Sequence, residues 1–400
     1  MEKIRFKYAV ELIMGQSPEK ESINYGGNGF PFLQGKADFG TISPTPTTWC
    51  DSPKKIAKKG DILLSVRAPV GDVNISNQEY AIGRGLCAIR AKKIDGRYCW
   101  YILQEINDTL HSFAVGTTYE SVTVDDIANL TVPYPDGLVQ KEIARYLDSK
   151  IGKIDELIEN QEKQHNMLEQ YKRELIANTI TKGLNKSAPM KGSGVDWLGN
   201  VPEHWNVTKM KWMFEVVKRI YGAEDRDVLS ITQRGIKVKD IDSNDGQLAE
   251  SYANYQVVNV NDFAMNSMDL LTGWVDCSPY EGVTSPDYRV FRFHHDKPQC
   301  HTYYKYLFQM CYTNRIFYRL GQGVSNLGRW RLQADQFLNM KMPQPPIEEQ
   351  EQIASYLDKK VGQIEELTAD IKAQIEKLKE YRKIVIHDAV TEKIKVTEGE

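Results

Sequence analysis

An internal repeat of 45 residues constrains this chain more than any other feature of its sequence. Residues 140–184 align without a gap with residues 350–394, at an offset of 210. Identities run through the whole alignment and include Gln140/Gln350, Ile143/Ile353, Leu147/Leu357, Gly152/Gly362, Leu168/Leu378 and Tyr171/Tyr381. Because self-similarity at a fixed offset indicates a duplicated structural unit, we expect the chain to fold as two related halves.

The duplication continues upstream of the repeated segments but becomes weaker there. The sequence VPYP that precedes the first segment matches MPQP before the second, and Tyr101–Gln104 aligns with Tyr306–Gln309 at an offset of 205. The order is therefore globular part, helix, globular part, helix, with similar helices and diverged globular parts.

The repeated segments have the composition of long helices, rich in Glu, Lys, Leu, Ile and Gln. A heptad assignment that starts at Leu147 places Lys150 and Lys360 on the apolar seam, and predicts these packing residues: Leu147, Ile154, Leu157, Leu168, Tyr171, Leu357, Ile364, Leu367, Leu378 and Tyr381. Each helix could pack on its own globular part, or the two helices could pack on each other. In the second case a pseudo-twofold axis makes them an antiparallel coiled coil with the globular parts at opposite ends.

The globular parts predict an α+β fold in which short strands alternate with Gly and Pro turns. We place the boundaries at 1–135 and 186–345 for the globular domains, and at 136–185 and 346–395 for the helical regions. Residues 186–200 are expected to be a Gly/Ser linker. The expected strands are 61–66, 71–75, 85–91, 228–232, 255–265 and 288–293, and the expected domain helices are 97–112 and 302–320.

The net charge of −3 argues by itself against a general nucleic-acid binder, which usually has a basic excess. The acidic excess, however, lies in residues 346–400, which hold 9 basic and 13 acidic side chains. The globular domains are near neutral and contain local basic groups of the kind that suits DNA phosphates, and with Arg also guanine edges. These groups are Lys54, Lys55, Lys58 and Lys59; Arg67, Arg84 and Arg90; and Arg315, Arg319, Arg329 and Arg331.

Catalytic signatures are missing from the sequence. It has no Walker A loop, no GxGxxG at a strand–helix junction, and no HExxH, GxSxG or [DN]PP[YF] motif. Asp136, Asp148 and Lys150 mimic a nuclease PD…DxK pattern, but the second copy has Pro346 where Asp136 stands. The six cysteines form no close pair and predict free thiols rather than a metal site. Without a membrane-length apolar run or a secretory signal, we expect a cytoplasmic protein.

The chain resembles the specificity (S) subunit of type I restriction–modification systems. The motifs that carry this resemblance are GVDWLGNVPEHW at 194–205, the (V/M)P(Y/Q)P entry into each helix, GQSP at 15–18, and the duplicated helices that end in YKRELI and YRKIVI. The resemblance implies two target-recognition domains, each reading one half of a bipartite, asymmetric DNA site. It also implies that the paired helices set the spacer between the half-sites and dock two methyltransferase (M) subunits.

The same resemblance implies a chain without catalysis of its own. S-adenosylmethionine, ATP and Mg would be bound by the partners, namely the M subunits, which methylate adenine N6, and the restriction (R) subunits. We predict DNA contacts from loops and turns at Lys36, Arg84, Thr117, Thr118, Tyr119, Arg219, Arg234, Ser325, Asn326, Arg329 and Arg331. A self-contained restriction enzyme and a coiled-coil adaptor that does not bind DNA are the alternative functions.

Overall fold

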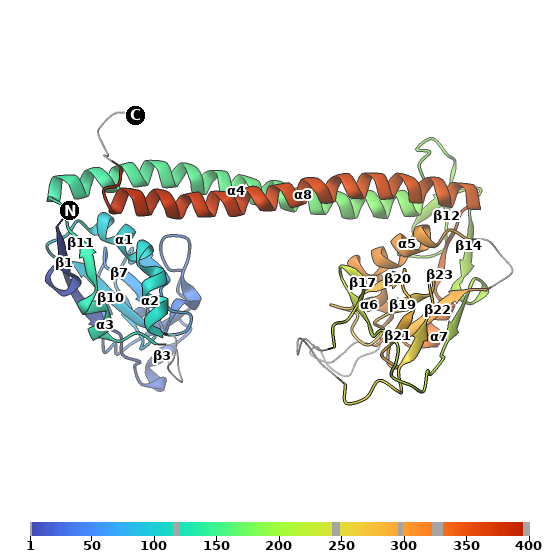
Figure 1. Cartoon of the computed structure of the whole chain (residues 1–400), viewed down its shortest axis with the longest axis horizontal. Coiled ribbons are helices and arrows are strands. Elements are labelled where there is room, and N and C mark those ends of the chain that lie inside the picture. The colour runs from blue at the N-terminus through green and yellow to red at the C-terminus, as the bar shows by residue number, and fades with distance from the viewer. Residues whose placement is uncertain (1, 115–120, 242–248, 295–298, 322–330, 395–400) are drawn as a thin grey trace. The chain divides into compact units, whose positions relative to one another are not determined.

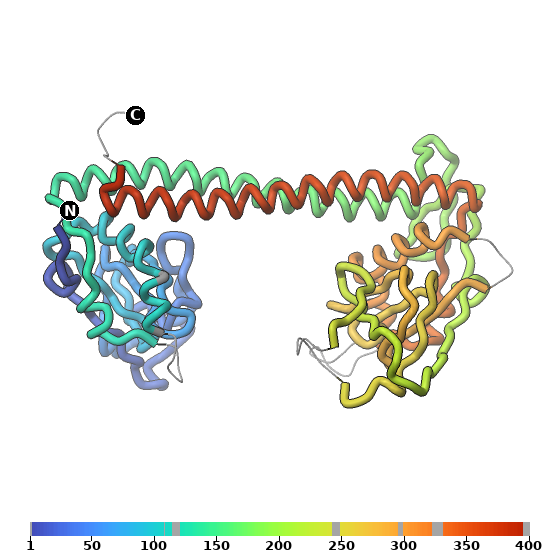
Figure 2. Tube along the Cα trace, viewed as in Figure 1, coloured from blue at the N-terminus to red at the C-terminus, as the bar shows by residue number. Residues whose placement is uncertain are grey.

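The computed structural model describes residues 2–114, 121–241, 249–294, 299–321 and 331–394. The chain divides into two compact units: unit 1 consists of residues 1–162 and 372–400, and unit 2 of residues 163–371. Both units contain parts of the two long helices α4 (Gly137–Lys182) and α8 (Ile347–Val390), which Figure 1 labels. In the unit that starts in blue, Figure 2 shows the red end of α8 beside the green start of α4.

The two helices run antiparallel within each unit. In unit 1 the Asp155 carboxylate lies 2.8 Å from Arg382, and the Gln161 amide donates to Gln374 at 3.0 Å. Residue numbers thus fall along α8 as they rise along α4. In unit 2, Lys172 of α4 forms an ion pair with Glu365 of α8 at 3.8 Å. The expected antiparallel pairing is confirmed, and each helical pair also packs on a globular core, so the two packing alternatives are combined.

The structure confirms only part of the predicted packing seam. Leu147, Ile154, Leu357 and Ile364 are buried, and Leu168 and Leu378 are half-buried. The prediction is wrong for four positions that are more than half exposed, which are Leu157, Tyr171, Leu367 and Tyr381.

The real seam follows 147, 151, 154 and 158 in α4 and 357, 361, 364 and 368 in α8. The predicted seam is therefore one residue out of phase at every second position, where it takes Lys150 in place of Ile151. One residue corresponds to about 100° of helix rotation, and burying Ile151 and Val361 avoids the desolvation of two lysines.

Unit 1 contains an antiparallel sheet that packs against helix α1 (Gly96–Glu105) and a second, mixed sheet. One sheet has the strand order β2-β10-β7-β8 and the other β3-β5-β4-β9-β6, while β1 pairs with β11. The strands are β1 (Lys3–Arg5), β2 (Val10–Met14), β3 (Ile23–Asn24), β4 (Phe30–Leu33), β5 (Thr48–Cys50), β6 (Ile56–Ala57), β7 (Ile62–Ser65), β8 (Val73–Ile75), β9 (Tyr80–Ile82), β10 (Leu86–Ala91) and β11 (Thr131–Pro133). Helices α2 (Asn107–Ala114) and α3 (Val124–Asn129) follow α1, and 3-10 turns span Phe6–Tyr8, Lys20–Ser22 and Lys36–Asp38.

Unit 2 repeats the central sheet of unit 1 in the order β15-β22-β19-β20, with β14 pairing with β23 as β1 pairs with β11. Its strands are β12 (Met190–Gly192), β13 (Asn200–Pro202), β14 (Asn206–Lys209), β15 (Phe214–Val217), β16 (Leu229–Thr232), β17 (Gly235–Val238), β18 (Gln256–Val258), β19 (Phe263–Met265), β20 (Val275–Cys277), β21 (Gly282–Thr284), β22 (Arg289–Phe293) and β23 (Lys341–Gln344). Helices are α5 (His301–Thr313), α6 (Ile316–Leu320) and α7 (Ala334–Asn339), with a 3-10 turn at Met210–Trp212. The common strand order confirms two pseudo-symmetric α+β domains.

Several expected elements are divided or replaced in the structure. The predicted strand 255–265 is two strands, β18 and β19, separated by the turn in which Asn261 has φ 70°. The predicted helix 302–320 breaks before Arg315, whose φ of 57° is left-handed and cannot continue a right-handed helix. The expected linker 186–200 contains β12, which pairs with β13 to form a hairpin.

The core of unit 2 joins the globular domain to the helical pair through Trp205. This side chain is fully buried, and its indole Nε1 donates to Glu349 of α8 at 2.8 Å. Tyr303 of α5 donates in the same way to the carbonyl oxygen of Ile180 in α4 at 2.9 Å. The equivalent bond in unit 1 runs from Tyr98 to the carbonyl oxygen of Val390 at 3.4 Å.

We expect Trp205→Ala to lower the free energy of unfolding by about 3–5 kcal/mol, since it empties a large buried site and removes one of the two partners of Glu349, the other being His204. Denaturant unfolding of the full chain measures this loss. Trp212, which is 66% exposed, provides the matched control, and Trp212→Ala should change stability by no more than about 0.5 kcal/mol. Equal losses in the two variants would contradict the assignment of Trp205 as a core residue.

Candidate nucleic-acid interface and partner surfaces

Most of the residues that we predict to contact DNA lie outside the part of the chain that the structure describes. Six of the eleven predicted residues lie outside the described part of the chain, namely Thr117, Thr118, Tyr119, Ser325, Asn326 and Arg329. They remain predictions from the sequence. The other five lie on described segments, and their surroundings differ.

Two of these five residues are held in ion pairs that stabilise the fold. Lys36 forms an ion pair with Asp72, both partly exposed. Arg219 bonds the carboxylate of Asp262, which is 5% exposed and also accepts from the Asn259 backbone N–H. The guanidinium of Arg219 therefore fixes the turn before β19, and this local role accounts for its place in the sequence.

Arg84, Arg234 and Arg331 are exposed, each next to a turn or at the end of a described segment. Arg84 lies between β9 and β10, and Arg234 lies in the turn between β16 and β17. The four lysines at 54, 55, 58 and 59 are exposed as well. These cations are accessible to a phosphate backbone.

Two cavities of similar volume occupy equivalent places in the two units. A cavity of about 650 Å³ in unit 1 is lined by Gly71, Gln104, Arg382, Lys383 and Ile386, among others. A cavity of about 640 Å³ in unit 2 is lined by Gly273, Gln309, Lys172, Arg173 and Ile176. The helix residues correspond at the repeat offset of 210 and the glutamines at 205. Each cavity thus lies where a globular domain meets the helical pair.

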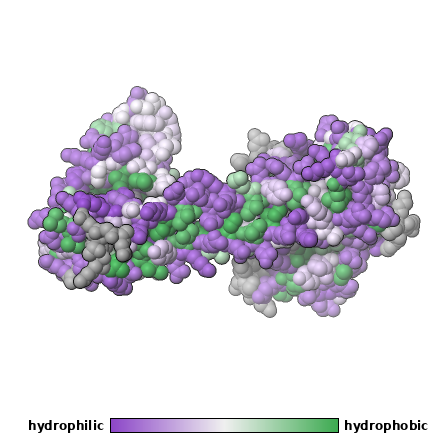
Figure 3. Space-filling model, turned by 90° about the horizontal axis from the view of Figure 1, so that it is seen from above, coloured by the Kyte–Doolittle hydropathy of each residue, from purple (hydrophilic) through white to green (hydrophobic). Residues whose placement is uncertain are grey.

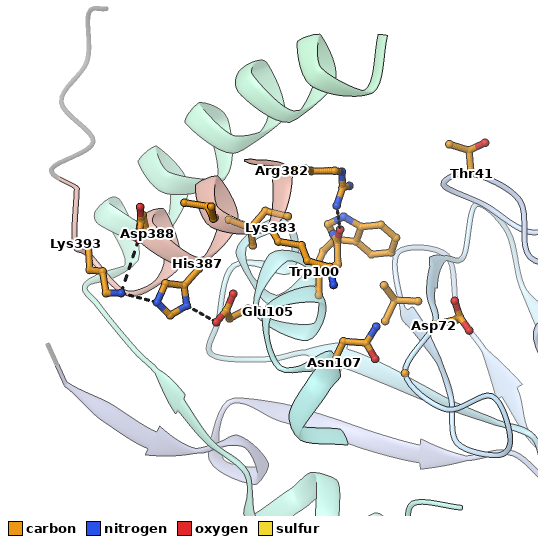
Figure 4. A pocket seen from close by; sticks show the side chains of 15 residues that line it. Thr41, Asp72, Trp100, Glu105, Asn107, Arg382, Lys383, His387, Asp388 and Lys393 are labelled. Carbon is orange, nitrogen blue, oxygen red and sulfur yellow. Dashed lines mark hydrogen bonds and ion pairs between the residues drawn. The ribbon is translucent and has the colours of Figure 1, made fainter. Parts of the chain in front are cut away.

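Figure 4 shows the cavity of unit 1 with its lining side chains. Arg382 donates to Gln104 at 3.0 Å, and His387 lies 2.5 Å from Glu105 and 2.7 Å from Lys393. The lining mixes cations, carboxylates and the indole of Trp100. Such a surface suits polar contacts with a protein segment. No group of His, Cys, Asp and Glu in the described residues could hold a metal ion.

The helical pairs expose apolar side chains at repeat-equivalent positions. Unit 1 presents Leu157 of α4 and Tyr381 of α8, and unit 2 presents Leu367 of α8 and Tyr171 of α4, all between 51 and 54% exposed. The Asp155–Arg382 ion pair places Leu157 and Tyr381 at one level of the helical pair. Figure 3 shows apolar side chains, in green, along the helices. Contiguous apolar patches mark protein contact surfaces, and these positions are candidates for such a contact.

The remaining general expectations concern cysteines and membranes. All six cysteines are free thiols, four of them buried and Cys277 and Cys300 half-buried. Burial raises the pKa of Cys87 to about 12, so this thiol is unreactive at neutral pH. In the described residues, every helix is too short or too polar to cross a membrane.

Comparison with known proteins finds one family whose model matches most of the chain. It is described as the type I restriction modification DNA specificity domain and matches twice, at residues 2–170 and 202–377. A specificity subunit of the MjaX type I restriction enzyme of Methanocaldococcus jannaschii is 39% identical over 173 residues, which cover 43% of this chain and 40% of that protein. The MjaVIII specificity subunit of the same organism is 25% identical over 321 residues, covering 76% of this chain and 72% of the relative.

A solved structure has the same fold along nearly the whole chain. It comes from work on complex assembly and conformational transition of the type I R-M system, and aligns with a TM-score of 0.71 over 97% of both chains. The sequence identity is 15%, so this likeness concerns the fold. The first relative is matched over only two fifths of its own length.

Proposed function

Because the chain belongs to the type I restriction modification DNA specificity family, we propose that each of its two recognition domains reads one half of a bipartite, asymmetric DNA site. It is a specificity subunit with two such domains. The observation that carries the proposal is the duplication itself. Two domains that share the strand order of the central sheet but differ in sequence suit two different half-sites, whereas an identical pair would suit a palindrome.

The helices supply the second part of the proposal, in which the coiled coil sets the spacer between half-sites. The seam repeats every seven residues in both helices and keeps them in one antiparallel register. Helices of 46 and 44 residues correspond to about 69 and 66 Å at 1.5 Å per residue. These lengths exceed the roughly 34–36 Å between half-sites that lie one DNA turn apart.

The exposed Leu–Tyr pairs support docking of two methyltransferase (M) subunits, one in each unit. Both pairs combine a leucine and a tyrosine at repeat-equivalent positions, so one partner surface could bind each of them. The equivalent cavities offer the same partner charged and polar groups where each helical pair meets its globular domain. Protein interfaces usually combine apolar contacts with polar ones.

We expect the double substitution Leu157→Asp and Tyr381→Asp to remove one of two bound M subunits. Two carboxylates would be desolvated in that interface, at a cost of at least about 2 kcal/mol, or about thirtyfold in affinity. Native mass spectrometry of the mixture measures the stoichiometry. Leu138→Asp, at a position 71% exposed at the start of α4, is the matched control and should keep two M subunits bound. Retention of both M subunits by the double variant would contradict this docking surface.

The chemistry in this proposal belongs to the partners. The M subunits would bind S-adenosylmethionine and methylate adenine N6, and restriction (R) subunits would join the complex with ATP and Mg. The chain itself is proposed to be non-catalytic and to act in the cytoplasm, where the DNA is. The sequence motifs that would favour a self-contained nuclease fail in the second copy of the repeat.

The direct test mixes the purified chain with the M subunit of its own system and with genomic DNA. The proposal expects adenine methylation only when both proteins are present. Methylation by the M subunit alone, or cleavage of DNA by this chain with Mg²⁺, would overturn it. The second result would favour the self-contained enzyme.

A further inference from the structure

Strand β22 of unit 2 contains a buried cation that has no carboxylate partner. The side chain of Arg289 is 9% exposed, and its guanidinium lies over the ring of Phe337, 4.9 Å from the ring centre. Nη2 donates to the carbonyl oxygen of Leu332 at 2.7 Å, while Nη1 has no hydrogen-bond partner. Among the described residues no acidic group forms an ion pair with Arg289.

Burial of a charge without a partner is unfavourable, and the fold carries this cost at Arg289. Desolvation lowers the pKa of Arg289 to about 10, so the guanidinium is still protonated at neutral pH. Aliphatic residues would pack in this strand at lower cost. Uncompensated charges of this kind are found at functional sites, where the ligand supplies the opposite charge.

Arg289 lines a cavity of about 330 Å³ whose rim carries two further cations, Lys218 and Arg331. Both rim residues are exposed. Val217 pairs with Val290 across β15 and β22, which brings Lys218 to the level of Arg289. Asp287 is the one acidic residue in the described lining. Three cations against one carboxylate give this cavity a positive potential.

The buried arginine is specific to unit 2. Arg289 pairs with Met265 of β19, and Cys87 pairs with Leu64 of β7 in the equivalent sheet of unit 1. The same alignment of the two sheets follows from two equivalent backbone hydrogen bonds, in which the N–H of Leu332 donates to the carbonyl oxygen of Ser267 and the N–H of Val122 donates to that of Val66. A buried thiol therefore occupies the place of the buried guanidinium, which means that Arg289 is not required by the common fold.

We propose that this cavity binds a backbone phosphate of the DNA that unit 2 recognises, with Lys218 and Arg331 in contact with the phosphate oxygens. Arg289 is the positioning residue beneath them. Its guanidinium donates a hydrogen bond to the carbonyl oxygen of Leu332, and this bond fixes the backbone next to Arg331. A guanine edge fits less well, since it needs two free guanidinium nitrogens, and here Nη2 is bonded and Nη1 is covered. The inference rests on the proposed function.

Fluorescence anisotropy of the full chain with a random-sequence duplex of about 30 base pairs tests the cavity. A protein loses affinity with salt at a slope of about 0.9 per neutralised phosphate, so the double variant Lys218→Ala/Arg331→Ala, which loses both contacts with this phosphate, should lower the slope by about 0.9. Between about 50 and about 300 mM salt the wild type should then lose about fivefold more affinity than this double variant. Lys191→Ala, an exposed lysine of β12, is the matched control and should behave as the wild type.

A double-mutant cycle with Arg289→Gln and Arg331→Ala tests the positioning role. If Arg289 acts through Arg331, the double variant should bind no more weakly than Arg331→Ala alone; additive losses would overturn that role. A wild-type salt slope in the Lys218→Ala/Arg331→Ala variant would overturn the phosphate site, whether or not Arg289→Gln folds. Absence of duplex binding by the wild type would overturn the phosphate site as well, whereas the proposed function fails only if methylation together with the M subunit is also absent.

Discussion

Ile386→Asp is expected to destabilise unit 1 strongly and to leave the stability of unit 2 unchanged. Ile386 lies in α8, 3% exposed, in a core that it shares with Ile102 of α1 and Leu147 of α4. Aspartate would lose the apolar contacts that isoleucine makes in this core, and its carboxylate would be desolvated there. We expect a loss of at least about 3 kcal/mol out of the 5–15 kcal/mol that are usual for a domain. Hydrogen exchange followed by mass spectrometry reports the two units separately.

The same helix offers a control for this experiment. Ile384 is two residues away and 48% exposed, so Ile384→Asp should leave the exchange of unit 1 within about 0.5 kcal/mol of the wild type. The comparison tests whether residues 372–400 complete a unit whose other part begins at the N-terminus. Loss of protection in unit 2, with unit 1 unchanged, would contradict this division.

The second large effect is expected from the length of the helices. We expect one extra heptad after Glu162 of α4, together with one after Ile371 of α8, to lengthen the DNA spacer and leave both half-sites unchanged. Seven residues add about 10.5 Å of helix, which corresponds to about three base pairs at 3.4 Å each. Both insertion points lie where the units divide, and a heptad keeps the seam in phase.

Methylation motifs of the wild type and the lengthened chain measure this effect. A heptad inserted into α4 alone is the control, because it breaks the register that the Lys172–Glu365 and Asp155–Arg382 ion pairs define. That control should lose methylation. A lengthened chain with the original spacer would show that the helices do not set it.

The overall architecture could be predicted from the sequence because its strongest signal is a repeat. The ungapped 45-residue match predicts two equivalent segments, and their composition predicts that both are helices. The phase of the seam was harder, because Leu157 and Tyr171 are apolar and fit a heptad as well as Ile151 does. Those apolar residues face outward, where a partner is proposed to cover them. The presence of Lys150 and Lys360 on the predicted seam was the signal that the phase was wrong.

The globular domains were less predictable, for reasons that are local. The segment 255–265 alternates like one strand, and only the backbone shows that Asn261 turns the chain between β18 and β19. The sequence also contains a signal for the start of helix α3 that the prediction did not use. Thr123 and Asp126 form a capping box at its start, in which each side chain bonds the backbone of the other residue.

The candidate contacts with DNA were predicted from residue type and turn position, and these do not show which partner a cation has. Arg219 and Lys36 have carboxylate partners far away in the sequence, Asp262 and Asp72. Arg289 was missed because an arginine in the strand YRVFRF looks like an exposed strand position. Its orientation depends on the sheet and on Phe337, which lies 48 residues further along the chain.

Single-molecule sequencing of genomic DNA methylated by the chain together with its M subunit tests the central claim most directly. The account predicts N6-methyladenine in one motif that consists of two different specified halves separated by a spacer of fixed length and unspecified sequence. A contiguous motif, a palindromic motif, or a methylation pattern that does not change when this chain is left out would contradict it.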